Sequence, residues 1–381
     1  MGNDIMKKII CPLEQCTGCM ACVNACPKQC IRMVEGEMGH WYPEVNMEVC
    51  VDCGMCERVC PTNHPVKKSV PLTAYAGWHK NIDEYHSSTS GGAAAALSQK
   101  MIAMGGVVYG CSSLPGLEIK HVRIDRMENL VQLKGSKYVQ SFIGDVYKQV
   151  KKDLQQNLNV LFVGTPCQIA GLKNFLRKDY PSLYTVDLIC HGVPSQAVLK
   201  QHVKRVSGNR GVRVQFRKGN DMGLRIFDDR DEMIYYSNVW YSRYKDVYFN
   251  TFIDGYTYRP SCYQCQYARK ERCSDITIGD FWGIGTDFKH DTVNGCSCML
   301  PITEKGKKIL EDCQLDLYER TVDEAVLGND QLRSPKKYDV RRRWFRKLNH
   351  WMGVGVAYRL CELDHILDKW VIQRIKRRLT R

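Results

Sequence analysis

The pattern C-x2-C-x2-C-x3-C-P occurs twice near the N-terminus and constrains the fold more than any other feature. It begins at Cys16 and again at Cys50, 34 residues later. Such a run binds paired 4Fe-4S clusters, because its first three cysteines hold one cluster and its fourth reaches the other. The spacing therefore predicts two clusters. Their ligands would be Cys16, Cys19, Cys22 and Cys60 for one, and Cys50, Cys53, Cys56 and Cys26 for the other.

Zinc is the alternative occupant of cysteine clusters. A structural zinc site needs four ligands, usually two cysteine pairs with a longer spacer, whereas these two runs supply eight cysteines. The chain has 20 cysteines, and ten of them precede residue 61. No apolar N-terminal segment suggests secretion, so we expect a cytoplasmic protein whose cysteines are metal ligands rather than disulfides.

Positive charge is concentrated at the C-terminus. The 381-residue chain has a net charge of +14, and residues 336–381 hold fourteen Lys/Arg against four Asp/Glu, a net of +10. The other 335 residues carry only +4, so we expect no nucleic-acid partner for the body of the chain.

The segment HSSTSGGAAAALSQKM predicts a polar loop that leads into a helix ending near Met104, followed by a strand at Val107 to Gly110. Free amides and hydroxyls at the start of a helix favour binding of a phosphate. An ordinary helix cap is the alternative. The candidate residues are Ser88, Thr89, Ser90, Gly91 and Gly92, with Ser136 and Lys137 further along the chain.

Several further side chains follow predicted strands. A buried strand at Val160 to Val163 leads to Thr165 and Cys167, and another ends near Cys190. Ligands gather at the carboxyl ends of strands in open α/β sheets, so Thr165 is a further candidate for cofactor binding. The candidates for proton delivery in such a site are His191 and Asp280.

A third cysteine group lies near residue 265. Cys262, Cys265 and Cys273 are three thiolates, one fewer than a third 4Fe-4S cluster requires. Cys167 is the preferred fourth ligand and Cys190 the other candidate. Zinc competes with a cluster for this group, because C-x2-C pairs serve both.

The stretches SSTSGG, GSKYVQS, VLFVGTPCQIAGL, ICHGVPS and CYQCQYARKERCSDITIGDFWG occur in this order between about residues 73 and 303. Together they resemble the beta-subunit family of coenzyme F-420 hydrogenases and dehydrogenases, with a dicluster ferredoxin module in front. The resemblance implies FAD, anchored by the loop at residues 88–92, and electron flow between clusters, flavin and an organic acceptor. Bacterial relatives often stand beside surface-polysaccharide genes, and the resemblance leaves open whether a deazaflavin is the substrate.

We therefore expect a mixed α/β protein of three parts. These are a dicluster 4Fe-4S ferredoxin-like domain at residues 1–70, an FAD and iron–sulfur catalytic body at 71–335, and a basic helical tail at 336–381. The leading function is an FAD-dependent iron–sulfur oxidoreductase with a ferredoxin-like or other redox partner and a small-molecule substrate. The alternative is a non-catalytic subunit that relays electrons to a partner enzyme.

The tail predicts an amphipathic helix. Its apolar side chains recur with helical spacing, and cations crowd its last turns. The apolar face either docks on the body of the protein or lies on the anionic inner face of the membrane. The residues concerned are Leu363, Ile366, Leu367, Trp370, Val371, Ile375 and Leu379, with the cations Arg374, Lys376, Arg377, Arg378 and Arg381.

Overall fold

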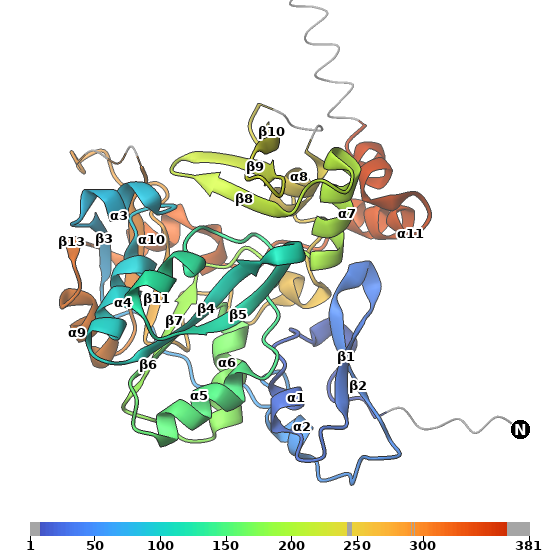
Figure 1. The fold of residues 1–381 in the computed structure, drawn as a ribbon, viewed down its shortest axis with the longest axis horizontal. Helices are drawn as coiled ribbons and strands as arrows, with labels where there is room; N and C mark the ends of the chain where they lie inside the picture. Colours follow the sequence, from blue (N-terminus) through green and yellow to red (C-terminus); the bar gives the residue numbers. More distant parts are fainter. Residues whose placement is uncertain (1–7, 242–245, 291, 293, 364–381) are drawn as a thin grey trace, which may run out of the picture.

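The structure, a computed structural model, describes residues 8–241, 246–290, 292 and 294–363 (Figure 1). Its centre is an eight-stranded mixed sheet with the strand order β13-β3-β12-β11-β7-β6-β4-β5. The inner strands β4, β6, β7 and β11 run parallel, so their carboxyl ends lie along one edge of the sheet. The eight strands are β3 (Ala74–His79), β4 (Val107–Leu114), β5 (Glu118–Ile124), β6 (Val160–Gly164), β7 (Leu183–Leu188), β11 (Ile276–Asp280), β12 (Ser297–Pro301) and β13 (Leu315–Arg320).

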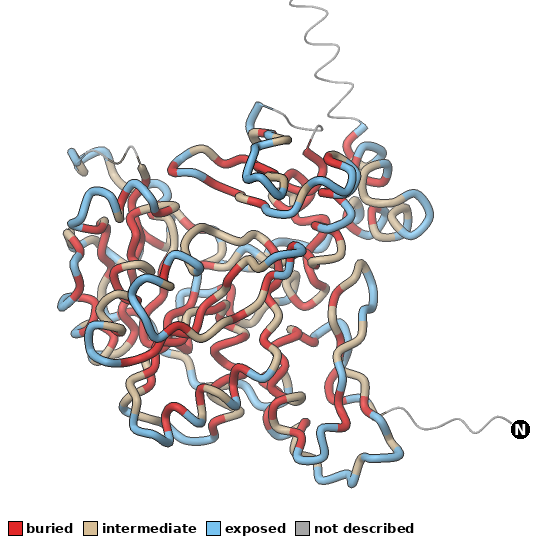
Figure 2. The backbone as a smooth tube through the Cα atoms, in the orientation of Figure 1, coloured by how far each residue is buried: buried red, intermediate tan, exposed pale blue. Residues whose placement is uncertain are grey.

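Helices cover both faces of this sheet, which confirms the predicted mixed α/β class. Adjacent residues of β4 point to opposite faces: Val108 packs with α4 and α9, whereas Val107 and Tyr109 pack with α5 and α6. Figure 2 shows the resulting concentration of buried residues along the central strands. The helices of this body are α3 (Ile82–Ser87), α4 (Ala93–Ala103), α5 (Val146–Gln155), α6 (Pro166–Leu176), α9 (Glu304–Glu311) and α10 (Val322–Gly328).

A second layer of structure packs above the main sheet in Figure 1. It is a three-stranded antiparallel sheet with the order β10-β9-β8, and helices α7 and α8 share its apolar core. Its elements are α7 (Gln196–Ser207), β8 (Arg213–Lys218), β9 (Asp221–Phe227), β10 (Met233–Asn238) and α8 (Val247–Ile253).

The N-terminal domain is small and packs beside α6. It consists of α1 (Ala21–Ala25), an antiparallel hairpin of β1 (Ile31–Glu35) and β2 (Trp41–Val45), and α2 (Met55–Arg58). Cys19, Met20 and Ala21 belong to the same buried cluster as α5 and α6. The domain is therefore joined to the body by a shared hydrophobic core as well as by the chain.

The C-terminal helix α11 (Val340–Cys361) docks on the body. Asp339 caps its first turn, and Gly353, at φ 74°, breaks it into two segments. Phe345 and Tyr358 are fully buried and pack against Tyr256. Of the apolar stripe predicted for the tail, all but the exposed Leu363 lies outside the described residues. None of the described helices combines the length and apolar character needed to span a bilayer.

Candidate functional site

The first predicted cysteine group is assembled around α1 and the end of α2. We call Cys16, Cys19, Cys22 and Cys60 the proximal group, because Cys19 packs directly on α6 of the body. Burial and the neighbouring Cys60 and Cys16 thiols raise the pKa of Cys19 to about 12. Burial and the same two thiols, together with Cys19, raise the pKa of Cys22 well above its usual value. The four thiols therefore lie close enough to influence one another electrostatically, as ligands of one cluster must.

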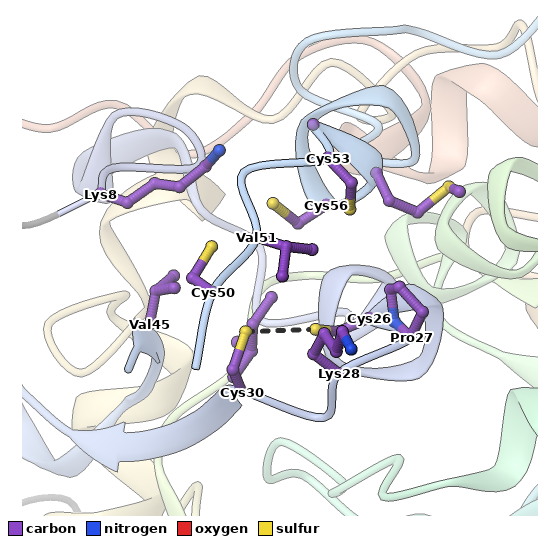
Figure 3. A pocket seen from close by; sticks show the side chains of 13 residues that line it. Lys8, Cys26, Pro27, Lys28, Cys30, Val45, Cys50, Val51, Cys53 and Cys56 are labelled. Atoms are coloured by element: carbon purple, nitrogen blue, oxygen red, sulfur yellow. Dashed lines mark hydrogen bonds between the residues drawn. The ribbon is translucent and has the colours of Figure 1, made fainter. Parts of the chain in front are cut away.

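The second predicted group faces a pocket on the outer side of the same domain (Figure 3). We call Cys26, Cys50, Cys53 and Cys56 the distal group; Cys53 is exposed, so this group lies nearer to solvent than the proximal one. Lys8 and Lys28 also line the pocket.

Each group has a fifth cysteine beside it that the spacing left unassigned. The Cys30 sulfur lies 3.4 Å from the Cys26 sulfur (Figure 3). The Cys11 thiol lies against the proximal group, where it lowers the pKa of Cys16 and of Cys60 to about 6 by hydrogen bonding to their sulfurs. Cys11 lies five residues before the first cysteine run and Cys30 four residues after it, so neither belongs to the repeated pattern.

The donor sets fit 4Fe-4S clusters. Each group consists of four thiols, the ligand set of a cubane. Within the part of the chain that the structure describes, no three His, Cys, Asp or Glu side chains converge on a point where one metal ion would bind. A cubane does not need such convergence, because its four thiolates bind four different iron atoms.

A third group of four thiols surrounds a cavity of about 290 Å³. Cys167 lies in the first turn of α6, Cys190 follows β7, and Cys262 and Cys265 lie in and just after a 3-10 helix at Pro260–Gln264. Burial raises the pKa of Cys167 to about 11 and that of Cys190 to about 12, and the neighbouring thiols contribute in the same direction. The sulfurs therefore face a common space at the carboxyl ends of β6 and β7.

Cys273 does not line this cavity. It is 3% exposed within the core below α6, and its thiol donates to the Pro166 carbonyl oxygen at 3.6 Å. The sequence grouped Cys273 with Cys262 and Cys265 because they are close in the chain, and offered Cys167 and Cys190 as alternatives. In the structure, Cys167 and Cys190 both line the cavity, whereas Cys273 does not.

Thr165, a predicted cofactor-binding residue, lies at the cavity of the third group beside Cys167. It caps α6 through a reciprocal pair of hydrogen bonds with Gln168, and its hydroxyl lies 3.2 Å from the Cys167 sulfur. Its role in the structure is to fix the turn that presents Cys167.

The Ser88–Gly92 loop meets the requirements for a phosphate site in part. The Ser90 hydroxyl is buried and has no hydrogen-bond partner among the described residues. Gly92, at φ 83°, begins α4 without a side-chain cap, so the first amides of that helix are free of such a partner. Thr89 lies 3.0 Å from the hydroxyl of Ser136, which brings these two predicted residues together. Free amides and an unpaired hydroxyl suit a phosphate oxygen.

Three other predicted residues of this loop region have structural partners. The Ser88 hydroxyl donates to the Glu84 carbonyl oxygen at 2.7 Å. Gly91 is packed against the sheet, where a Cβ atom would lie 2.1 Å from the Gly77 carbonyl oxygen. Lys137 donates to two backbone carbonyl oxygens at 2.9 Å, and burial lowers its pKa. Gly91 is therefore required for packing, which the sequence did not reveal.

Asp280 and His191 lie close enough to influence each other, but in different settings. Asp280 ends β11 and accepts a 2.6 Å hydrogen bond from the buried guanidinium of Arg217. His191 lines the cavity of the third group. Desolvation by the surrounding residues lowers the pKa of His191, and the Asp280 carboxylate opposes this effect. His191 is thus the better placed of the two to exchange a proton, because Asp280 is committed to an ion pair.

Two regions of the chain, one in the N-terminal domain and one in the body, match known protein families. Residues 15–64 match the 4Fe-4S dicluster domain, and residues 158–325 match the C terminus of the coenzyme F-420 hydrogenase/dehydrogenase beta subunit. Among curated proteins, a ferredoxin 7Fe of Hydrogenibacillus schlegelii is 42% identical over 52 residues, which are 13% of this chain and 60% of that protein. An uncharacterized ferredoxin of Methanocaldococcus jannaschii is 38% identical over 56 residues, which are 15% of this chain and 71% of that protein.

Among solved structures, a chain of the F-420-reducing NiFe hydrogenase complex from Methanosarcina barkeri is similar at 15% identity and a TM-score of 0.47. The similarity covers 69% of this chain and 89% of that one.

Proposed function

Because the chain belongs to the coenzyme F-420 hydrogenase/dehydrogenase beta-subunit family and carries a 4Fe-4S dicluster domain, we propose that it is an iron–sulfur flavoprotein oxidoreductase. It would take electrons from a low-potential, ferredoxin-like donor and deliver them through clusters and FAD to an organic acceptor. The observation that carries this proposal is the presence of three separate groups of four facing thiols, two in the N-terminal domain and one in the body.

The groups are arranged in an order that suits directed transfer. The distal group is nearest to solvent, where a donor protein would dock. The proximal group follows, with Cys19 so close to α6 that a Cβ atom on Gly171 would lie 2.9 Å from the Cys19 sulfur. Cys167 of the third group lies on the same helix, one turn earlier. Electrons would therefore cross from the domain into the body at α6.

FAD would convert one-electron transfer through the clusters into the two-electron chemistry of an organic acceptor. The chain's own contribution would be to hold the pyrophosphate with the Ser90 hydroxyl, the Thr89 and Ser136 hydroxyls and the first amides of α4. His191, at the edge of the third cavity, would exchange a proton with the acceptor. Ser88, Gly91 and Gly92 would shape the loop rather than touch the cofactor.

The third group is proposed to hold a 4Fe-4S cluster with Cys167, Cys190, Cys262 and Cys265 as ligands. Zinc is the alternative for this group, because C-x2-C pairs serve both metals, although the four described thiols do not converge on one point as a single zinc ion requires. Anaerobic purification followed by iron, sulfide, zinc and flavin analysis tests the whole scheme. We expect about twelve irons per chain with FAD, about eight with zinc if the third group holds that metal, and rejection of the scheme if the protein is colourless and contains only zinc.

A relay subunit that serves a partner enzyme is the second candidate. It is favoured by large aromatic side chains on the surface: Trp240, Tyr241 and Trp351 are 64%, 91% and 83% exposed. Such side chains are enriched at protein interfaces. Reduction of a soluble organic acceptor by the isolated chain, for example a precursor in surface-polysaccharide metabolism, would exclude the relay function.

We also propose a cytoplasmic location with peripheral contact to an anionic membrane through the basic tail. Arg342 and Arg346 of the docked helix α11 bond to the body, whereas residues 364–381 hold six Lys/Arg against two Asp/Glu. Cations of this kind are attracted to anionic lipid headgroups.

A further inference from the structure

Arg259 is a fully buried guanidinium at the junction of the N-terminal domain and the body. Its side chain is 0% exposed. Its Nε atom donates to the Cys16 carbonyl oxygen at 2.5 Å, and its Nη2 atom donates to the Trp41 carbonyl oxygen at 2.7 Å. Nη2 also lies 3.5 Å from the Cys16 sulfur, and the guanidinium covers the Tyr42 ring at 4.3 Å.

Within the described part of the chain, Arg259 has no carboxylate partner. Its remaining hydrogen bond goes from Nη1 to the amide oxygen of Gln140, at 3.2 Å. Other buried guanidinium groups do have one: Arg217 pairs with Asp280 and Arg272 with Asp187. A buried cation is unfavourable unless a negative charge compensates it.

The charged groups near Arg259 do not supply that compensation. Glu37, a carboxylate that acts on Tyr42 as Arg259 does, is engaged by Arg346 at 2.6 Å. His40 is buried beside Arg259, and burial together with the positive charges of Arg259 and Arg346 lowers its pKa to about 3, so it is neutral. The negative charge that Arg259 lacks must therefore come from the cysteine group that it contacts.

We propose that the 4Fe-4S cluster of the proximal group is the counter-ion of Arg259, and that Arg259 raises the reduction potential of this cluster above that of the distal one. The inference rests on the proposed ligation of the two N-terminal clusters. Four thiolates give the cluster a net negative charge, which increases by one when it takes up an electron. A fixed cation that donates toward a ligand sulfur stabilises the reduced form more than the oxidised form.

Among the described residues, the distal group has no buried cation that lacks a carboxylate partner. Lys8 beside its pocket pairs with Asp52 and with Glu57. Arg58 donates to the Cys53 carbonyl oxygen at 2.7 Å, but its side chain is exposed to water, as is that of Lys28. The two clusters would be bound by matching cysteine runs, yet among the described residues the body supplies a buried cation to the proximal group alone. A single electron would thus pass favourably from the distal cluster to the proximal cluster. The transfer would oxidise the distal cluster and reduce the proximal one. That is the direction toward α6 and the third group.

The test is a potentiometric titration of the full-length, cluster-loaded protein followed by electron paramagnetic resonance. Arg259→Gln removes the charge but keeps donors, and Arg259→Lys keeps the charge. Arg346→Met is the matched control, because it removes a nearby guanidinium that is already paired. The Cys22→Ala and Cys56→Ala variants assign the signals to the proximal and the distal cluster.

At the potential that is the midpoint of the proximal cluster in the wild type, we expect Arg259→Gln to lower the reduced-to-oxidised ratio of this cluster at least tenfold. This change equals a midpoint potential lower by about 59 mV for a one-electron couple. The midpoint potential of the distal cluster should not change in Arg259→Gln. In Arg259→Lys and Arg346→Met, the midpoint potential of the proximal cluster should stay near the wild-type value. Loss of the proximal cluster in Arg259→Gln, with retention in Arg259→Lys, would also support a counter-ion. An unchanged potential in Arg259→Gln, or equal loss of the cluster in Arg259→Lys, would overturn the inference. Wild-type protein without N-terminal clusters would instead refute the proposed function.

Discussion

The ligands of the third group provide the sharpest prediction, because the structure exchanges one cysteine for another. Cys190 lines the cavity, whereas Cys273 is buried behind it with its thiol directed to a backbone carbonyl. Replacing Cys190 with Ala removes one of four ligands without leaving an unpaired polar group in the core. We expect the loss of about four irons from about twelve per chain.

Cys273→Ala should have the opposite result. The substitution deletes one buried sulfur atom, which we expect to destabilise the fold by about 1 kcal/mol, and it should leave the iron content unchanged. Cys313→Ala is the matched control, since Cys313 is equally buried and its thiol also lies against a backbone carbonyl, far from any cysteine group.

Iron and sulfide are measured on anaerobically purified protein, and the thermal midpoint reports stability. Loss of iron in Cys273→Ala with retention in Cys190→Ala would refute the geometry of the cavity. If Cys190→Ala loses zinc rather than iron, the proposed ligands of the third group would stand, and the metal that they bind would be zinc.

Four further predictions follow from other parts of the structure. Asp187→Ala leaves Arg272 buried and unpaired, so urea unfolding should show a loss of about 3–5 kcal/mol, and a change below 1 kcal/mol would contradict a buried ion pair. Ser90→Asp places a carboxylate where a phosphate would bind, so flavin content should fall while iron is retained; normal flavin content would move the site elsewhere. Deleting residues 364–381, while keeping the docked helix α11, should abolish salt-sensitive flotation with anionic liposomes, to which each nearby cation contributes about 1 kcal/mol; equal flotation of both proteins would exclude the tail. Burial lowers the pKa of His121 to about 4, against about 6.5 in the unfolded chain, so the unfolded state binds the proton more readily and stability should fall by about 2 kcal/mol between pH 7 and 5; His121→Gln should show a shallower dependence, and identical slopes would refute this assignment.

The regular elements were predicted well where local pattern decides them. The helix after the Ser88–Gly92 loop, expected to end near Met104, ends at Ala103, and the strand expected at Val160 to Val163 extends one residue further, to Gly164. Apolar runs between glycines and polar loops contain this information in themselves.

The sites were harder to predict because they depend on which distant segments meet. Proximity in the chain suggested that Cys273 joins Cys262, whereas the return of the chain after β7 brings Cys190 instead. The sequence placed Gly91 in a predicted phosphate-binding loop. In the structure, its lack of a side chain is required by the close approach of β3. Arg259 carries no local pattern at all, and only tertiary packing shows that it has no carboxylate partner.

The attachment of the N-terminal domain and the path of the electrons depend on the same contacts. Arg259 and Gln140, both from the body, bond to the backbone of the first cysteine run, at Cys16 and Thr17. Gly18 must remain small there, because a Cβ atom would lie 2.7 Å from the Gln140 side chain. Any movement of the domain would thus remove the cation from the proximal cluster and lower its potential as well as lengthening the path to α6. An electron held by the proximal cluster is therefore stabilised only while the domain is docked, so the docked arrangement is the one in which transfer into the body is both shortest and energetically favoured.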